Sequence, residues 1–474
     1  MKYEMIIGLE IHVELGTKSK IFCSCSTQFG SKPNSNVCPV CLGMPGVLPV
    51  LNERVVEYAI KAGLALNCEI AKYSKMDRKN YFYPDLPKAY QVSQFDFPLC
   101  LNGYLDITTN KETTRIGITR IHIEEDAGKL IHAQDGTLID YNRCGVPLIE
   151  IVTEPDIRSA EQAVEFAKSV RNILLYAGVS DCKMQEGSMR FDVNLSIREQ
   201  GRKEFGTRTE MKNLSSFKML QKAIEYEYKR QVKAVKNNEK IIQQTRRWDE
   251  TNNESVVLRS KENAHDYRYF PEPDLLPIIL NDEIIEEIRY NMPELPKAKK
   301  KRYISELALS EYDADVLTSN SELCSFYENI LNEFNDPKTA ANWVSVELMA
   351  LMNQKDVSIE DILINPSNMA QLLNNINDGK ISGKMAKGIL LEMFETGKNA
   401  NEIIKSKGLY QISDTAELEK IIDQVLKSNP ASIADYKAGK QKALGFLVGQ
   451  VMRLTKGTAN PKSVNEILIS KLNG

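Results

Sequence analysis

The sequence predicts an α+β protein in which a sheet-rich N-terminal part precedes a helical C-terminal part. Before about residue 280, hydrophobic residues alternate with polar ones in several segments, among them 6–15 and 187–198, as they do in half-buried strands. Beyond the proline- and lysine-rich segment 291–302, NMPELPKAKKKR, the hydrophobic period is that of amphipathic helices. We therefore place a domain boundary in this segment.

Length and composition are those of an ordinary globular protein. The chain has 474 residues, of which 42% are hydrophobic and 26% charged, so it can form two or three domains. It has no apolar run of 18 residues, and its N-terminus lacks the features of a signal peptide. We predict a cytoplasmic protein with no membrane partner. Because the formal net charge is -3, any contact with nucleic acid must come from a local basic surface.

The first predicted strand, residues 6–15, places Glu10 and His12 on the same polar face. Its other face consists of Ile, Leu and Val side chains. A carboxylate beside an imidazole offers oxygen and nitrogen ligands to a metal ion. A solvated outer face of a half-buried strand would give the same pattern.

Four cysteines form two close pairs, C-S-C and C-P-V-C. They are Cys23, Cys25, Cys38 and Cys41. Thiolates at this spacing can close a tetrahedral zinc site, and a site with four sulfur ligands is structural. Free or redox-active thiols are the alternative. The other five of the nine cysteines stand singly and are expected to fill small apolar sites.

Residues 75–94, KMDRKNYFYPDLPKAYQVSQ, combine basic and aromatic side chains after a predicted helix at 52–66. Lys79 and Lys88 could contact phosphate, while the Tyr and Phe rings could stack on a base. A proline-rich loop packed on a sheet is the alternative. Further helices are predicted at 156–178 and about 215–233.

Two predicted strands within 115–152 carry three carboxylates. The first ends in Glu124 and Glu125, and the second ends near Glu150, which stands between two isoleucines. Neighbouring strand residues point to opposite faces, so Glu124 and Glu125 can share a face only if the strand bends or ends there. A carboxylate in a buried strand needs a cation or a donor, and a metal ion is the simplest partner. An exposed acidic strand end is the alternative.

The strand predicted at 187–198 has an unusually polar face with Arg190, Asp192 and Asn194, and the following strand carries Lys212. Basic side chains at these positions could offset the charge of a triphosphate, although surface strands of mixed charge are common. The sequence contains no G-x-x-x-x-G-K-[ST], G-x-G-x-x-G or H-E-x-x-H motif. Any ATP would therefore be held by metal, carboxylates and basic side chains on a sheet.

The C-terminal segment 427–462 has a strong excess of positive charge. Against one acid, Asp435, it carries Lys427, Lys437, Lys440, Lys442, Arg453, Lys456 and Lys462. In a slightly acidic protein this bias favours RNA phosphate as a partner, and a solvated helix face is the alternative.

Several long strings and a basic ending carry a family resemblance. They are GLEIHVEL, CPVCLGMPGVLPVLN, DRKNYFYPDLPKAYQ, ITRIHIEEDAGKL, DYNRCGVPLIEIVTEPD, HDYRYFPEPDLLP and KALGFLVGQVMRLTKGTANP. They closely resemble the B subunits of the bacterial aspartyl/glutamyl-tRNA amidotransferases, and the resemblance covers essentially the whole chain. The related archaeal E subunits have an inserted domain before their helical part, for which the segment 280–302 leaves no room.

The resemblance implies three domains. Residues 1–292 would form a cradle-shaped catalytic domain on an antiparallel sheet, with a zinc knuckle at 23–41. Residues 293–408 would form a helical domain, and 409–474 a tail domain like the YqeY proteins that binds tRNA.

The resemblance also implies an activity. The enzyme would use ATP and Mg²⁺ to phosphorylate the side-chain carboxylate of Glu on tRNA(Gln) or Asp on tRNA(Asn), and ammonia would then convert it into the amide. A glutaminase A subunit would supply ammonia, and a small C subunit would complete a heterotrimer. Nothing in this chain resembles a glutaminase nucleophile with its base.

The resemblance and the residue patterns together suggest roles for single residues. By the resemblance, the magnesium region maps onto Glu10, His12, Glu124, Glu125 and Glu150. The expected catalytic residues are His12, Lys88, Glu125 and Glu150. The expected nucleotide-binding residues are Lys79, Arg190, Asp192, Asn194 and Lys212. Structural Zn²⁺ is expected at the four paired cysteines.

Two other functions are compatible with the residues. The first is a carboxylate-amine ligase that acts on a free amino acid. The second is a non-catalytic, zinc-containing subunit that binds tRNA.

Overall fold

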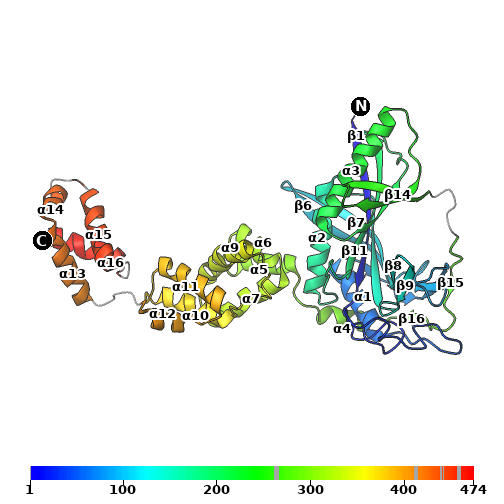
Figure 1. Cartoon of the computed structure of the whole chain (residues 1–474), viewed down its shortest axis with the longest axis horizontal. Coiled ribbons are helices and arrows are strands. Elements are labelled where there is room, and N and C mark those ends of the chain that lie inside the picture. Colours follow the sequence, from blue (N-terminus) through cyan, green and yellow to red (C-terminus); the bar gives the residue numbers. More distant parts are fainter. Residues whose placement is uncertain are drawn as a thin grey trace. The chain divides into compact units, whose positions relative to one another are not determined.

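The computed structural model describes residues 2–260, 266–409, 415–437, 440, 442–455, 459 and 461–473. It divides into two compact units, 1–295 and 296–474. The first unit contains the sheets and the described elements of the second are helices, which confirms the α+β prediction (Figure 1). The predicted domain limits at 292 and 408 stay predictions.

The main sheet of the first unit has nine strands in the described part of the chain. In spatial order they are β14 (Glu254–Ser260), β13 (Gln244–Asp249), β12 (Thr209–Leu214), β11 (Met189–Glu199), β1 (Tyr3–Glu14), β10 (Pro147–Thr153), β7 (Glu112–Glu125), β6 (Cys100–Thr109) and β2 (Glu69–Ile70). Neighbouring strands are antiparallel, except that β12 and β13 are parallel. The sheet is therefore almost entirely antiparallel.

Smaller sheets lie beside the main one. They pair β3 (Tyr73–Ser74) with β16 (Ile278–Ile279), β4 (Asp77–Asn80) with both β5 (Tyr90–Ser93) and β15 (Phe270–Pro271), and β8 (Lys129–Ala133) with β9 (Gly136–Asp140). The segment after residue 265 thus returns to pair with strands near residue 75.

The helices of the first unit are α1 (Glu53–Ala65), α2 (Ala160–Tyr176), α3 (Phe217–Lys236) and α4 (Asp282–Tyr290). The first three confirm the helices predicted from periodicity, and the side chains of Asn52, Ser159 and Ser216 cap their N-termini. Figure 1 shows α2 and α3 on one side of the main sheet.

The alternation of β1 decides which face of the sheet is covered. Its Ile and Leu side chains join one hydrophobic core with the buried stripes of α2 and α3, where Phe166 and Leu220 are fully buried. Each such side chain contributes about 1.5–3 kcal/mol by leaving water. The polar residues of β1 must then point to the opposite face.

The second unit is built from short helices. They are α5 (Pro296–Ser305), α6 (Glu311–Thr318), α7 (Ser321–Leu331), α8 (Pro337–Asn342), the π-helix η1 (Trp343–Leu348), α9 (Met349–Lys355), α10 (Pro366–Asn377), α11 (Gly383–Thr396), α12 (Ala400–Lys407), α13 (Thr415–Ser428), α14 (Pro430–Lys437), α15 (Lys442–Leu454) and α16 (Pro461–Asn473). Helices α13, α15 and α16 share a core of their own, in which Ile422, Leu447 and Leu468 are fully buried. Among the described residues, no helix combines the length and the hydrophobicity needed to span a bilayer.

A glycine in β6 is required by close packing. A Cβ on Gly103 would collide with the sulfur of Cys68 and lie 2.9 Å from the carbonyl oxygen of Leu66. We predict that Gly103→Ala lowers the free energy of unfolding of the first unit by about 1–3 kcal/mol, because neither neighbour can move freely. Denaturant unfolding measures this.

Gly16→Ala is the matched control in the same unit. Its Cβ would make only an ordinary contact, 3.7 Å from the carbonyl oxygen of Val179. A change of at most about 0.5 kcal/mol is expected there. Equal losses in the two variants would contradict the packing argument.

Candidate active site

The register of the central strands assembles a group of two histidines and two glutamates, the His12 group. His12 of β1 pairs with Glu150 of β10, and Glu150 pairs with His122 of β7. Paired residues share a face of the sheet, with Cβ atoms about 5 Å apart. Glu124 lies two residues beyond His122 on β7 and therefore points the same way.

The donor atoms of this group are close together. His12 Nε2 lies 3.6 Å from Glu124 Oε1 and 3.5 Å from Glu150 Oε2, and His122 Nε2 lies 3.3 Å from the same Glu150 oxygen. His12, Glu124 and Glu150 each present an atom within 4.8 Å of the other two. One divalent ion could bind all three residues, since carboxylate and imidazole ligands both suit such ions.

Opposite charges within the His12 group offset the cost of burying them. Burial by itself would lower the pKa of His12, but the hydrogen bond to Glu150 and the charges of Glu150 and Glu124 raise it to about 9. Burial would raise the pKa of Glu150, yet the two histidines hold it well below its usual value. His12 and Glu150 therefore stabilise each other's charged forms.

His122 was not among the predicted site residues. It is buried, and its Nδ1 has no hydrogen-bond partner among the described residues. The sequence does indicate it, because His122 stands between two isoleucines and two residues before Glu124, so both polar side chains lie on the same strand face. What the sequence does not provide is the register that places it opposite Glu150.

A second polar group, the Glu10 group, lies on the same face. Glu10 of β1 pairs with Asp192 of β11, and these two residues and Glu210 of β12 present oxygens within 4.8 Å of one another. Lys212 lies 2.6 Å from Asp192 and 3.0 Å from Glu210. Asn194 donates a hydrogen bond of 2.8 Å to Glu10. Burial, followed by the charges of Glu150 and Asp192, raises the pKa of Glu10.

A pocket of about 610 Å³ opens beside the Glu10 group. Its walls come from β1, β10, β11 and the loop before β12, and they include Gly8, Thr153, Asn194, Phe205 and Arg208. Small-molecule sites typically measure roughly 300–1,000 Å³. The pocket thus has the volume for a nucleotide and combines an aromatic side chain with polar groups.

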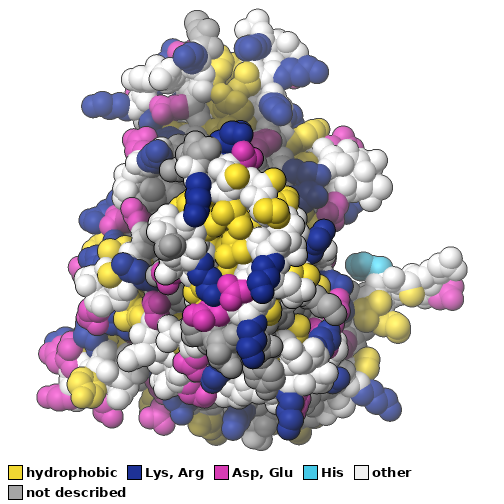
Figure 2. Space-filling model, turned by 90° about the vertical axis from the view of Figure 1, so that its left-hand side faces the viewer, with side chains coloured by type: hydrophobic (Ala, Val, Ile, Leu, Met, Phe, Trp, Pro, Cys, Tyr) yellow, Lys and Arg dark blue, Asp and Glu magenta, His cyan; other side chains and the backbone are white. Residues whose placement is uncertain are grey.

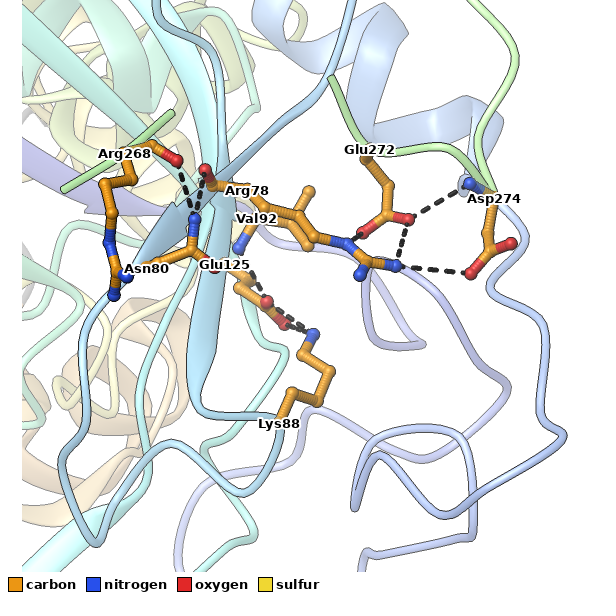
Figure 3. A network of polar contacts seen from close by, with 8 residues as sticks. All are labelled: Arg78, Asn80, Lys88, Val92, Glu125, Arg268, Glu272 and Asp274. Carbon is orange, nitrogen blue, oxygen red and sulfur yellow. Dashed lines mark hydrogen bonds and ion pairs between the residues drawn. The ribbon is translucent and has the colours of Figure 1, made fainter. Parts of the chain in front are cut away.

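Glu125 points away from the His12 group, because it ends β7 and follows Glu124 directly. It accepts hydrogen bonds from Lys88 Nζ at 2.5 and 2.7 Å and from the backbone N–H of Val92 at 2.8 Å (Figure 3). Both Lys88 and Glu125 line a small cavity of about 100 Å³.

An arginine ties the returning segment 266–274 to the strand pair β4–β5. Arg78 makes hydrogen bonds of 2.7 and 2.8 Å to Glu272 and approaches Asp274 at 3.3 Å (Figure 3). Asn80 donates to the carbonyl oxygen of Arg268 at 2.8 Å. These contacts fix the segment beside Lys79, whose Nζ lies 5.1 Å from the ring centre of Tyr267.

Two predicted phosphate ligands are held by acidic neighbours. Burial opposes the charge of Lys79, but the charges of Glu124 and Glu150 raise its pKa, so its ammonium lies within electrostatic reach of the His12 group. Arg190 lies 3.1 Å from the buried Asp126. Lys79 is thus close to the candidate cation site, whereas Arg190 is committed to an ion pair.

Comparison with known proteins places this chain in a family. Residues 5–286 match the model described as the GatB/GatE catalytic domain, and 325–472 match the GatB domain. The B subunit of the aspartyl/glutamyl-tRNA(Asn/Gln) amidotransferase of Caldicellulosiruptor saccharolyticus is 58% identical over 100% of this chain and 99% of its own length. The chain belongs to the B subunits of the aspartyl/glutamyl-tRNA amidotransferases.

Other relatives of the same name agree. The B subunit of Caldanaerobacter subterraneus subsp. tengcongensis is 57% identical over the full length of both chains, and that of Geotalea daltonii is 53% identical, also over the full length of both. The family predicted from the sequence strings is thereby confirmed.

In this B-subunit chain the five predicted magnesium residues fall into three places. His12, Glu124 and Glu150 lie together, Glu10 lies in the neighbouring group, and Glu125 binds Lys88. Among the predicted nucleotide ligands, Asp192, Asn194 and Lys212 surround Glu10. The roles assigned to these residues stay predictions.

The four paired cysteines of the B-subunit chain also lie together. Cys23, Cys25, Cys38 and Cys41 each present a sulfur within 4.8 Å of the others, and none of the four is in a disulfide. The hydrogen bond from Cys23 lowers the pKa of Cys41 to about 4. Such a sulfur set fits tetrahedral zinc.

The chain just after the predicted knuckle at 23–41 packs directly on the Lys88 backbone. Gly43 adopts a positive φ of +64°, and a Cβ there would lie 3.2 Å from Lys88 Cα. Any zinc site in the knuckle therefore lies next to the Lys88–Glu125 pair.

The Arg78–Glu272 pair generates a stability prediction. Glu272 is 3% exposed, so Arg78→Met would leave a buried carboxylate without its bidentate partner. We predict a loss of about 3 kcal/mol in the free energy of unfolding of the first unit, measured by denaturant titration.

Lys72→Met is the control for charge removal. Lys72 pairs with Asp282 at 2.7 Å, but both side chains are largely exposed. Such pairs contribute at most about 1 kcal/mol. If both variants lost the same stability, burial of Glu272 would not be the reason.

Proposed function

We propose that this chain phosphorylates the side-chain carboxylate of Glu on tRNA(Gln), or of Asp on tRNA(Asn), and converts it into the amide. The observation that carries the proposal is the pair of acidic groups on one sheet face, around His12 and Glu10, beside a pocket of nucleotide size. The relatives, named as B subunits of aspartyl/glutamyl-tRNA(Asn/Gln) amidotransferases, support the same reaction.

The chemistry requires two steps. A carboxylate is a poor electrophile, so one of its oxygens first attacks the γ-phosphorus of ATP and ADP leaves. Ammonia then attacks the carbonyl carbon of the acyl phosphate, inorganic phosphate leaves, and the nitrogen gives up one proton. The first step brings two anions together and therefore needs positive charge between them.

The His12 group is our assigned site for Mg²⁺, since it combines two carboxylates with an imidazole. A bound Mg²⁺ would neutralise the repulsion between phosphate and carboxylate and help to align them. Lys79, whose pKa the charges of Glu124 and Glu150 raise, would add a further positive charge. His122 holds Glu150 through its Nε2 and acts as a positioning residue.

The pocket beside Glu10 is our assigned nucleotide site. Phe205 offers an aromatic surface to the base, while Asn194 and Arg208 offer donors to ribose or phosphate. Lys212 compensates the carboxylates of the Glu10 group, which would otherwise repel a triphosphate. A nucleotide bound there would have its phosphates next to the His12 group, because Glu10 and His12 share a strand face.

Lys88 and Glu125 are our candidates for handling the attacking nitrogen. Their ion pair is buried and borders the cavity of about 100 Å³, which can hold a few molecules of the size of water or ammonia. Glu125 is our candidate acceptor for the proton that the nitrogen loses. Ammonia itself would come from a glutaminase A subunit in a heterotrimer with a C subunit, and the naming of the relatives as one lettered component of an amidotransferase supports an assembly of several different chains.

The C-terminal helices are our assigned contact with tRNA. Figure 2 shows Lys and Arg side chains, with Asp and Glu among them, around exposed hydrophobic ones on the face turned to the viewer. Lys437, Lys442 and Arg453 are exposed, as is Phe446 of α15. Lys456 and the side chain of Lys462 lie outside the described residues. Structural zinc at the four cysteines completes the proposal.

The main test is ATP hydrolysis by the complex reconstituted with its partner subunits. It should depend on misacylated tRNA, with label from ammonia entering aminoacyl-tRNA and not free glutamate. Glu150→Gln should lower the rate at least about 100-fold, because it removes a carboxylate from the cation site.

Glu154→Gln is the matched control. Glu154 follows β10 and is exposed, where it accepts a hydrogen bond from Thr119. It should keep the normal rate. Label in free glutamate would favour a ligase for free amino acids, and hydrolysis without any tRNA dependence would contradict the proposal.

The tail prediction concerns salt-sensitive tRNA binding. Replacing Lys437, Lys442 and Arg453 together by Glu should weaken tRNA binding at least about tenfold and flatten its dependence on salt, because fewer counterions are released from the RNA. Filter binding at several salt concentrations measures both effects. Binding that is unchanged would refute a role for this surface.

A further inference from the structure

Lys20 is a buried lysine without a carboxylate partner in the described part of the chain. It is 1% exposed. Its ammonium nitrogen lies 3.6 Å from Cys41 Sγ and 3.2 Å from the carbonyl oxygen of Tyr141. Lysines are almost never buried unless they are paired, because an ammonium loses its hydration on burial. Among the described residues, the ammonium directly contacts Cys41 Sγ and the Tyr141 carbonyl oxygen, so the cysteines are the nearest source of compensating charge in direct contact with it.

The geometry points to the four-cysteine cluster as the counter-ion of Lys20. We propose that Lys20 is a charge-compensating and positioning residue for a four-thiolate metal site and that it sets the affinity of this site for zinc. The inference rests on the zinc site proposed above and is independent of the amidotransferase reaction.

The charge of the cluster selects between its possible chemical states. Four thiolates around a divalent ion carry a net charge of -2, which an adjacent ammonium partly offsets. Four neutral thiols or two disulfides carry no charge, and either would leave the ammonium buried beside uncharged sulfur. Burial of Lys20 thus favours a charged cluster, with at least Cys41 as a thiolate, over two disulfides or four neutral thiols.

Backbone contacts hold Lys20 in this position. Its N–H donates to the carbonyl oxygen of Cys25 at 2.9 Å, while the N–H of Ile21 donates to Gly145 at 2.9 Å. The backbone of Lys20 therefore binds the first half of the knuckle and its side chain binds the second half, at Cys41. The neighbouring loop adds a hydrogen bond from Cys144 Sγ to the carbonyl oxygen of Cys41 at 3.4 Å.

The experiment measures zinc content and zinc affinity of the full-length protein by competition with a chromophoric chelator. Lys20→Met keeps the length of the side chain and removes its charge. Loss of such an outer contact to a metal ligand weakens binding about 10–100-fold. Lys18→Met, an exposed lysine two residues away, is the matched control and should leave the affinity unchanged.

The same substitution in a Cys25→His variant separates the effect of the Lys20 charge from that of its packing. Cys25→His changes the cluster charge from -2 to -1, so the Coulomb energy lost with Lys20 is about half as large. Lys20→Met should then weaken zinc binding by only about 3–10-fold. An equal loss in both backgrounds would indicate a packing role and overturn the proposal, as would an affinity within twofold of the wild type.

Two further outcomes are informative. The single variant Lys20→Met could fail to fold. In that case the proposal requires the double variant, Lys20→Met with Cys25→His, to fold and bind zinc. Failure of both variants to fold would overturn the proposal. Wild-type protein that binds no zinc would reject the metal site itself, which is a different failure from a zinc-binding protein that does not need Lys20.

Discussion

The antiparallel pairing of β1 with β10 on one side and β11 on the other is the constraint on which the rest of the structure depends. This pairing places His12 opposite Glu150 and Glu10 opposite Asp192. A shift of one residue in either pairing would turn the polar residues of one strand into the hydrophobic core. The isoleucines of β1, packed against α2 and α3, prevent such a shift because they would be exposed by it. The hydrophobic packing on one face of the sheet thus determines which polar side chains meet on the other face.

Several buried carboxylates of the first unit are each paired with a basic side chain. Glu125 lies against Lys88, Asp192 against Lys212, and Glu272 against Arg78. Each pair loses hydration on folding and offsets that loss only through close contact with its partner. Such an arrangement is costly for stability but leaves charged groups in defined positions, as a site that handles phosphate and carboxylate requires.

The cysteine knuckle belongs to the same arrangement and is not a separate appendage. Gly43 packs on Lys88, and the cavity lined by Lys88 and Glu125 is also lined by Cys41 and Lys20. A metal in the knuckle would therefore hold one wall of this cavity in place. A structural metal bound there would support residues that we propose for the reaction.

The sequence by itself determined the fold class, the family and most of the residue types at the site. Strand alternation predicted that Glu10 and His12 share a face, and the cysteine spacing predicted the four-sulfur group. These features depend only on local periodicity, which the chain expresses directly. Only the tertiary structure separated Glu125 from Glu124 and brought His122 to Glu150. Strand register and the pairing of buried charges join residues far apart in the chain, so no local pattern can specify them.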